Sequence, residues 1–310
     1  MRGALSLKPS YYDALRRLTL ELAGVRMGSD HAFLVETRLA SLAREEGFAS
    51  LDAMVDELFG SGQTRLAIRV VSALVERDTH FHHDPESLET LERVALEDLA
   101  RARGGGGRVD LLCYGCGSGQ DVYSLAMRAE ALREQGRFGG MGINVTGIDY
   151  PSQALERARA GRYTHFEVQR GLSASELLQW FVPEPDGDWR VRPELRRLVA
   201  FREMHLLSGL DELATYHGVI FRGALSHYSA PALLRVLRSL TRLIRPHGYL
   251  LLGTGEDLGD MHFGLDPVAG APGLYRKREV VVTPEPTGKQ PTERRDFGPR
   301  TKPARRSGLR

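Results

Sequence analysis

The most constraining feature of the sequence is a glycine-rich turn between an apolar run and a helical pattern. The run VDLLCY is short and apolar, as in strands buried on both faces, and GCGSG follows it at Gly115–Gly119. The helical pattern DVYSLAMRAEALRE begins directly afterwards at Asp121. Glycines in such a unit let the backbone turn sharply and approach a ligand, at the edge of a parallel sheet where α/β domains bind nucleotides.

Strand and helix patterns alternate along this part of the chain, which predicts a mostly parallel sheet with helices on both faces. Asp149 ends the strand pattern at 143–148, where a carboxylate can accept two hydrogen bonds from a ribose diol. A GxGxG turn alone is weak evidence, and a tight turn near a solvated acid is the simpler interpretation. The other strand patterns occupy 216–221 and 248–253, and the helical patterns occupy 121–134, 151–160 and 230–244.

Residues 5–75 predict a small helical module, because apolar side chains recur at three- and four-residue spacing without any strand pattern. Asp84-Pro85 predicts a further helix start, with an N-cap followed by proline at the first helical position. The predicted N-caps within the module are Ser10, Ser29 or Asp30, and Ser50.

Three regions are therefore expected: a helical domain at 1–76, an α/β domain at 77–282 and a basic tail at 283–310. Within the α/β domain, a turn at Asp186-Gly187 is flanked by strand-prone residues, so we expect an inserted antiparallel ribbon at about 180–202. From Thr283 onward, proline, threonine and charge dominate and predict disorder. The tail could be a tether, a nucleic-acid or membrane-surface contact, or a solubilising end.

The charge distribution argues against nucleic acid as the main partner. The chain has a formal net charge of +2, but the tail holds eight Lys/Arg and three Asp/Glu, so the other residues sum to −3. Phosphate binding needs a concentrated basic face. No apolar run approaches the roughly 18 residues that cross a bilayer, and no secretory signal is evident, so we expect a cytoplasmic protein without membrane insertion.

Metal and redox chemistry are also disfavoured. Cys113 and Cys116 have CxxC spacing, but they lie in a strand-then-glycine pattern rather than where a redox motif would begin a helix. The histidines of HFHHD at 80–84 alternate in direction if extended, and no second His/Cys cluster supplies further ligands. We therefore expect no metal site.

Beyond these patterns, the chain resembles the chemotaxis receptor methyltransferases called CheR. The family's glycine loop GCSTGEEPYSLAM is matched by GCGSGQDVYSLAM, and its ALxxARxGxY is matched by ALERARAGRY. Its ribbon GxYxVxPELRxxVxF is matched by GDWRVRPELRRLVAF, and its LLLGxxE by LLLGTGE. TRLASLAREEGF and LYRKR match the family as well, so the resemblance spans about residues 5–278. It implies a Rossmann-like class I methyltransferase domain preceded by a small all-α domain.

The resemblance implies S-adenosylmethionine-dependent O-methylation of glutamate side chains on the cytoplasmic helices of a chemoreceptor. A glutamate is ionised at neutral pH because its pKa is about 4.3, so positioning matters more than a strong base. Basic side chains on the second helix, here Arg38 and Arg44, would face the receptor, although their spacing alone indicates a solvated surface. The implied catalytic residues are Tyr228 and Arg222. The implied cofactor-binding residues are Thr79, Phe81, His83, Gly115, Gly117, Gly119, Asp121, Asp149, His205 and Arg222.

Several positions depart from the family pattern. The differences are Arg77 for asparagine, His83 for arginine, His205 for asparagine, and Arg222-Gly223-Ala224 for the segment CRN. Neighbouring strand residues face opposite sides, so Arg222 can replace the lost arginine only if the strand has ended before it. The alternative hypothesis is a degenerate methyltransferase-like protein that binds S-adenosylmethionine or S-adenosylhomocysteine as a sensor or scaffold.

Overall fold

The fold is taken from a computed structural model that describes residues 7–28, 32–75, 79–104 and 106–279. The predicted tail at 283–310, the candidate caps Ser29 and Asp30, and Arg77 lie outside these residues. None of the described helices is long and apolar enough to span a membrane.

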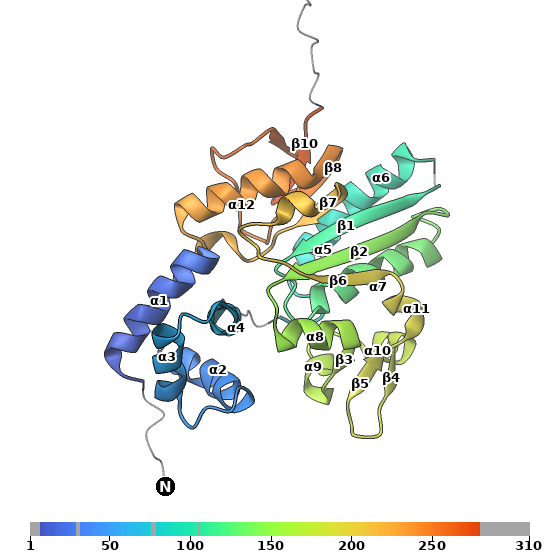
Figure 1. The fold of residues 1–310 in the computed structure, drawn as a ribbon. Helices are drawn as coiled ribbons and strands as arrows, with labels where there is room; N and C mark the ends of the chain where they lie inside the picture. Colours follow the sequence, from blue (N-terminus) through green and yellow to red (C-terminus); the bar gives the residue numbers. More distant parts are fainter. Residues whose placement is uncertain (1–6, 29–31, 76–78, 105, 280–310) are drawn as a thin grey trace, which may run out of the picture. The chain divides into compact units, whose positions relative to one another are not determined.

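The described N-terminal region is helical, as predicted (Figure 1). It has its own apolar core. Leu39, Met54 and Val70 are fully buried there. Ser50 caps its helix by accepting a hydrogen bond from the Ala53 N–H (3.1 Å). Ser10 is not a cap, because the first helix begins one residue earlier with a proline, whose missing N–H is tolerated at that position. The helices are α1 (Pro9–Ala23), α2 (Ala32–Glu45), α3 (Leu51–Gly60) and α4 (Thr64–Val75).

A seven-stranded sheet forms the centre of the α/β region, in the order β6-β2-β1-β7-β8-β10-β9. The strands β6, β2, β1, β7 and β8 pair in parallel, whereas β10 is antiparallel to β8 and β9. The mostly parallel sheet is thus confirmed. Its strands are β1 (Arg108–Tyr114), β2 (Gly142–Asp149), β6 (Val199–Glu203), β7 (Tyr216–Ile220), β8 (Ile244–Leu251), β9 (Leu265–Pro267) and β10 (Leu274–Lys277).

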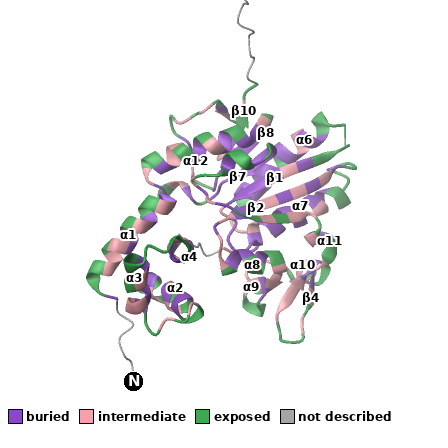
Figure 2. Ribbon diagram, viewed as in Figure 1, coloured by how far each residue is buried: buried purple, intermediate pink, exposed green. Residues whose placement is uncertain are grey.

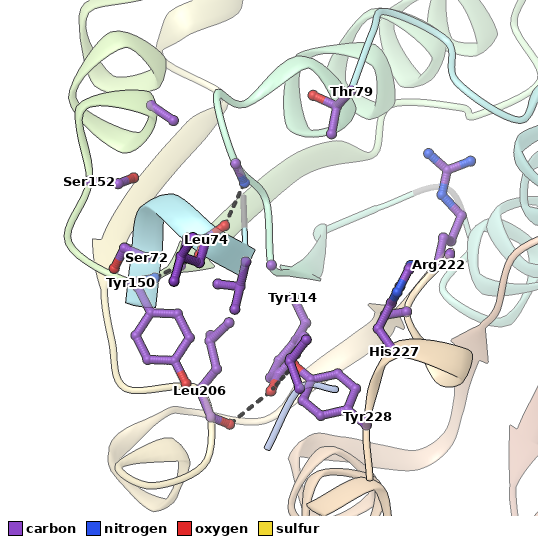
Figure 3. Close-up of a pocket in the computed structure, with 18 of the residues that line it drawn as sticks. Ser72, Leu74, Thr79, Tyr114, Tyr150, Ser152, Leu206, Arg222, His227 and Tyr228 are labelled. Carbon is purple, nitrogen blue, oxygen red and sulfur yellow. Dashed lines mark hydrogen bonds between the residues drawn. The ribbon is translucent and has the colours of Figure 1, made fainter. Parts of the chain in front are cut away.

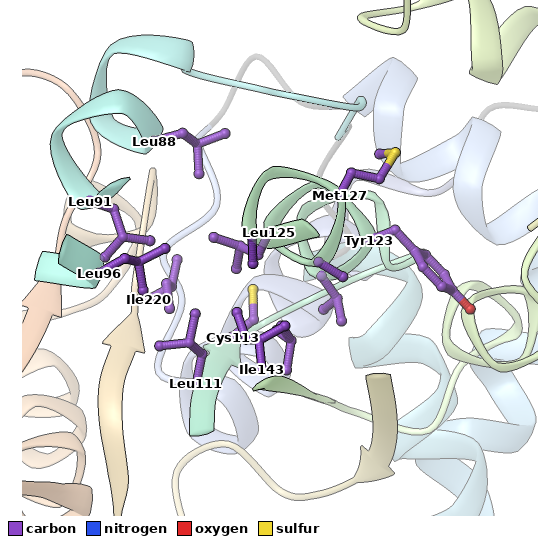
Figure 4. Close-up of a cluster of buried hydrophobic side chains, with 14 of the residues drawn as sticks. Leu88, Leu91, Leu96, Leu111, Cys113, Tyr123, Leu125, Met127, Ile143 and Ile220 are labelled. Carbon is purple, nitrogen blue, oxygen red and sulfur yellow. The ribbon is translucent and has the colours of Figure 1, made fainter. Parts of the chain in front are cut away.

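Helices cover both faces of this sheet, and consecutive residues of β1 enter different cores. Leu111 packs in a cluster with Leu125 (Figure 4), whereas Leu112 packs in a second cluster with Leu237. Figure 2 shows the central strands largely buried, as the mainly apolar composition of β1 predicts. The helices are α5 (Pro85–Thr90), a π-helical turn (Leu91–Leu96), α6 (Glu97–Ala102), α7 (Gln120–Glu134), α8 (Gln153–Ala160) and α12 (Ala230–Leu243).

The inserted antiparallel ribbon is present, but both limits of the predicted range 180–202 are wrong, because the ribbon also includes residues 162–163 and does not include 199–203. Residues 199–203 form β6, which pairs in parallel with β2 at the edge of the large sheet. The helix α11 (Pro193–Arg196) leads the chain back to this edge, where the Val145 N–H donates to the Leu198 carbonyl (2.9 Å). The ribbon is β3 (Arg162–Tyr163), β5 (Trp189–Val191) and β4 (Phe181–Pro183), with α9 (His165–Gln169) and α10 (Ala174–Trp180) between β3 and β4.

The segment after α1 is bound directly to the segment that carries Tyr228. Val25 forms an antiparallel bridge with Tyr228, and the Ser229 N–H donates to the Gly24 carbonyl (2.8 Å). Gly24 ends α1 in the left-handed region (φ +69°), and a Cβ there would lie 2.3 Å from the Cβ of Ala232. Only glycine therefore permits this close approach, which brings the helical region to the site.

Candidate functional site

A cavity of about 420 Å³ opens at the carboxyl ends of β1, β2 and β7. This volume lies in the range of sites for small molecules. Tyr150 and Ser152 lie on one side of it, and Arg222 and His227 lie on the other (Figure 3). It is lined by Val25, Arg26, Met27, Leu34, Arg38, Ser72, Leu74, Val75, Thr79, His83, Tyr114, Gly115, Gly117, Asp121, Asp149, Tyr150, Ser152, Ala154, Leu206, Arg222, Gly223, Ala224, His227 and Tyr228.

The glycine turn and Asp149 form one wall of the cavity. Gly115 and Gly117 line it with backbone alone, and both adopt left-handed angles (φ +68° and +52°). The Asp149 carboxylate accepts hydrogen bonds from the N–H of Gly117 (2.6 Å) and of Tyr150 (2.7 Å). A carboxylate has about four acceptor sites, so these bonds fix its orientation without exhausting its capacity.

Thr79 enters the cavity beside this turn. Its hydroxyl donates to the Gln120 side-chain oxygen (2.8 Å), which also accepts from the Ser118 hydroxyl (2.6 Å). Gln120 is the first residue of α7, so this oxygen ties Thr79 to the start of the helix that follows the glycine turn.

Arg222 lies two residues beyond the end of β7, so strand alternation no longer sets its direction. Its side chain is 2% exposed and forms an ion pair with Asp121 (2.7 Å). The other guanidinium nitrogen donates to the His83 and Asp84 carbonyls (2.7 and 3.2 Å) and to the Ser87 hydroxyl (2.9 Å). The guanidinium is thereby held at the cavity between two loops and α7.

Tyr228 belongs to a small network of buried phenols. The Tyr114 hydroxyl donates to the Leu206 carbonyl (2.8 Å) and lies 3.2 Å from the Tyr228 hydroxyl. Either hydroxyl can be the donor in this pair. Burial raises the pKa of Tyr114 well above its usual value and also raises the pKa of Tyr150. These two phenols therefore stay protonated at neutral pH and supply hydrogen-bonding groups rather than charge.

The helical region contributes a further wall. Arg38 of α2 lines the cavity and donates to the Leu74 carbonyl (2.8 Å), and Arg26 and Ser72 line it as well. Arg44 is exposed, donates to the Ala40 carbonyl within α2 (3.1 Å) and does not line the cavity. Of the two arginines that the sequence singles out, Arg38 alone reaches the site.

Most of the predicted catalytic and cofactor-binding residues come together at the cavity, although three of them do not line it. Phe81 is fully buried, with its ring edge-on to Tyr163 (5.0 Å) and Phe181 (5.5 Å). Those that do line it are Thr79, His83, Gly115, Gly117, Asp121, Asp149, Arg222 and Tyr228.

Gly119 and His205 are the other two predicted residues outside the cavity lining. A Cβ on Gly119 would lie 2.7 Å from the Cβ of Ala158, so this glycine serves helix packing instead. His205 packs edge-on to Tyr150 (5.3 Å) and contacts the Ser208 hydroxyl (3.1 Å). Burial lowers the pKa of its imidazole.

The sequence interpretation missed Tyr114, Tyr150, Leu206 and Ser72, which also line the cavity. Tyr114 and Tyr150 stand at the ends of β1 and β2, where ligands bind in open α/β sheets, so their positions held a usable signal. Leu206 and Ser72 lie in a loop and on α4, and no local pattern marks them.

The lining matches the chemistry of an adenosyl group joined to an amino acid. One side offers the oriented Asp149 carboxylate for a ribose diol beside the apolar surfaces of Tyr150, Ala154 and Leu206. The Arg222–Asp121 pair offers groups of both charges for an amino acid. Among the described residues, no group of three or more His, Cys, Asp or Glu side chains could hold a metal ion.

A mostly parallel sheet with a glycine turn after β1 and an acid at the tip of β2 defines a Rossmann-like domain of the kind that binds nucleosides. The family model "CheR methyltransferase, SAM binding domain" matches residues 77–268. The chain therefore belongs to the CheR methyltransferase family, as its sequence motifs predict.

Curated relatives support this membership along most of the chain. A chemotaxis protein methyltransferase 1 of Pseudomonas aeruginosa is 30% identical over 86% of this chain and 97% of its own length. A chemotaxis protein methyltransferase of Pseudomonas putida is 29% identical over 83% of this chain and 94% of its own length. A solved glycopeptide N-methyltransferase in complex with S-adenosylmethionine covers 56% of each chain at 13% identity and a TM-score of 0.31, a likeness too weak to carry a conclusion.

Proposed function

We propose that the protein methylates glutamate side chains on the cytoplasmic helices of a chemoreceptor, using S-adenosylmethionine. The observation that carries the proposal is one cavity that brings the Asp149 carboxylate, the Arg222 guanidinium and the Tyr228 hydroxyl to the ends of neighbouring strands. The names of the two Pseudomonas relatives, which this chain matches over nearly their full length, support a chemotaxis substrate. Such a substrate places the protein in the cytoplasm.

The cofactor would be held by Asp149 at its ribose and by the glycine backbone at 115–117. When bound, it supplies an electrophilic methyl group that a carboxylate oxygen can accept, leaving neutral S-adenosylhomocysteine. The acceptor glutamate is already ionised at pH 7, so no residue of the chain must remove a proton. Arg222 and Tyr228 orient the acceptor carboxylate, and Arg38 contacts the substrate from the helical wall. Orientation of this kind contributes about 7–11 kcal/mol to rate enhancements in general.

The test is methyl transfer to a receptor. The full chain is incubated with methyl-labelled S-adenosylmethionine and the cytoplasmic fragment of the cognate receptor, and base-labile label is counted after separation. We expect label on glutamate residues of the fragment, and loss of label when those glutamates are changed to alanine. Absence of base-labile label with folded receptor would contradict the proposal.

A second candidate is a protein that binds the cofactor or its demethylated product without turnover. The observation that favours it is the engagement of Arg222, whose guanidinium already has acceptors in Asp121, Ser87 and two carbonyls. Calorimetry with S-adenosylhomocysteine distinguishes the two candidates when it is combined with the label assay. Binding without label supports the second candidate, and binding with label supports the first.

A further inference from the structure

The turn after β8 does not line the cavity, yet it binds two segments that do. Glu256 accepts three backbone hydrogen bonds through its carboxylate. One oxygen accepts from the N–H of Gly223 (2.8 Å) and of Gly253 (2.9 Å), and the other accepts from the N–H of Leu225 (3.0 Å). Gly223 and Ala224 line the cavity directly after Arg222, whereas Glu256 does not line it. Glu256 therefore binds the backbone of this cavity wall from outside the cavity.

The same turn also binds the loop on the other side of Arg222. Thr254 donates to the Asp84 carboxylate from its backbone N–H (2.8 Å) and from its hydroxyl (2.6 Å). Asp84 follows His83, whose carbonyl accepts a hydrogen bond from Arg222. Burial opposes ionisation of Asp84, but the bonds from Thr254, a hydrogen bond from Ser87 and the charge of Arg222 together outweigh it and lower the pKa of this carboxyl below its usual value.

The backbone is shaped to allow both contacts. A Cβ on Gly253 would lie 3.0 Å from the Glu256 carboxylate and 3.0 Å from the Gly223 nitrogen, so a side chain there would push into the bond between them. Gly223 itself adopts a left-handed backbone (φ +60°), and Asp84 does so as well (φ +52°). Left-handed backbone at a non-glycine residue such as Asp84 persists only where surrounding contacts hold it.

We propose that Thr254 and Glu256 are positioning residues, which fix Arg222 by holding the segments on both sides of it. This inference rests on the proposed methyl transfer and names residues of that reaction that touch neither cofactor nor substrate. Arg222 and His83 reach the site from loops that are distant in sequence, and the turn after β8 bonds to the segments of both. A shift of about 1 Å in such a group can reduce turnover about a hundredfold.

The experiment compares Glu256→Gln with wild type and with Asp260→Asn, a matched control at an exposed acid near the same turn. A glutamine amide has one acceptor oxygen in place of two, so its NH2 group must face at least one of the backbone N–H groups that Glu256 binds, and the hold on the segment 223–225 weakens. We expect amide hydrogen exchange in peptides covering 221–228 to rise about tenfold or more, as expected when a local contact opens. We expect kcat to fall at least tenfold and the dissociation constant of S-adenosylhomocysteine to change by a smaller factor than kcat.

A second pair of variants keeps the test decisive if Glu256→Gln folds poorly. Thr254→Val removes the hydroxyl bond to Asp84 and Thr254→Ser keeps it, so only the valine variant should lower kcat. Unchanged exchange at 221–228 in Glu256→Gln, or equal kcat for the two Thr254 variants and wild type, overturns the positioning role. Amide hydrogen exchange can be measured whether or not the protein is active. An inactive wild type would therefore refute the proposed function, and the exchange rates at 221–228 would still test the positioning role.

Discussion

The ion pair between Arg222 and Asp121 predicts a large coupling energy between these two residues. Their side chains are 2% and 17% exposed, and the guanidinium nitrogen lies 2.7 Å from the carboxylate oxygen. Removing one partner of a buried pair leaves an uncompensated charge and costs about 3–5 kcal/mol. Both Arg222→Met and Asp121→Asn should therefore lower the free energy of unfolding by about that amount. The double variant should lose less than the sum, by about 2 kcal/mol, as for charged residues in direct contact.

The assay is urea unfolding at pH 7 for the wild type, both single variants and the double variant. An exposed pair provides the matched control, because Arg242 and Asp211 have the same 2.7 Å contact with side chains 64% and 79% exposed. Their coupling should be at most about 1 kcal/mol. If the two substitutions at Arg222 and Asp121 add within about 0.5 kcal/mol, the pair is not the buried unit described above. The double variant should lose less stability than the two single losses add up to, and it should not regain turnover, since Arg222 would still be missing from the site.

Three further predictions concern single positions. Asp149→Asn should weaken S-adenosylhomocysteine binding about 10–100-fold by calorimetry, because hydrogen bonds to a charged group contribute about 1.5–3 kcal/mol; unchanged affinity would remove Asp149 from the cofactor site. Tyr228→Phe should lower kcat and leave that affinity within about twofold; an unchanged rate would show that its hydroxyl is not needed. The pKa of Asp84 lies below its ordinary 3.8 in the folded protein, so the stabilisation by its bonds to Thr254 is present above about pH 4 and is lost as the pH falls through the folded value. Unfolding free energies should therefore separate wild type from Thr254→Val at pH 7 and converge as the pH falls below the folded-state pKa of Asp84; a constant difference would contradict this assignment.

The parts of the fold that the sequence predicts are those with local causes. The apolar run before the glycine turn predicts β1, and the Ser50 side chain caps α3 through the Ala53 N–H three residues ahead. Asp149 was predictable for the same reason, because a residue at the end of a parallel strand reaches the ligand edge of the sheet. Each of these signals spans only a few residues, so one chain segment is enough to recognise it.

The predictions that are wrong concern residues whose structure depends on contacts with distant segments of the chain. Phe81 fills a core position because Tyr163 and Phe181 of the ribbon pack against it, which no pattern near residue 81 indicates. The predicted ribbon includes residues of β6 because they are as strand-prone as the ribbon itself. That β6 belongs to the large sheet depends on its pairing with β2, which is distant in sequence. Glu256 lies in the motif LLLGTGE, whose sequence gives no sign of its contacts. Those contacts depend on two loops, at 83–84 and 222–225, that meet the turn after β8.

Arg222 places a guanidinium at the cavity although the segment around it, Arg222-Gly223-Ala224, differs from the family's CRN. A shift of one residue within a strand would turn the side chain to the opposite face. The strand β7 ends at Ile220, however, so direction at residue 222 is set by contacts of the loop rather than by alternation. Arg222 contacts the Asp121 carboxylate on α7 and the carbonyls of His83 and Asp84. The next residue, Gly223, donates its N–H to the Glu256 carboxylate. The lost CRN segment is therefore no reason by itself to expect an inactive protein. If Arg222→Lys, which keeps the charge but not the fork of donors, retained full turnover, charge alone would suffice at this position and the geometric part of the argument would fail.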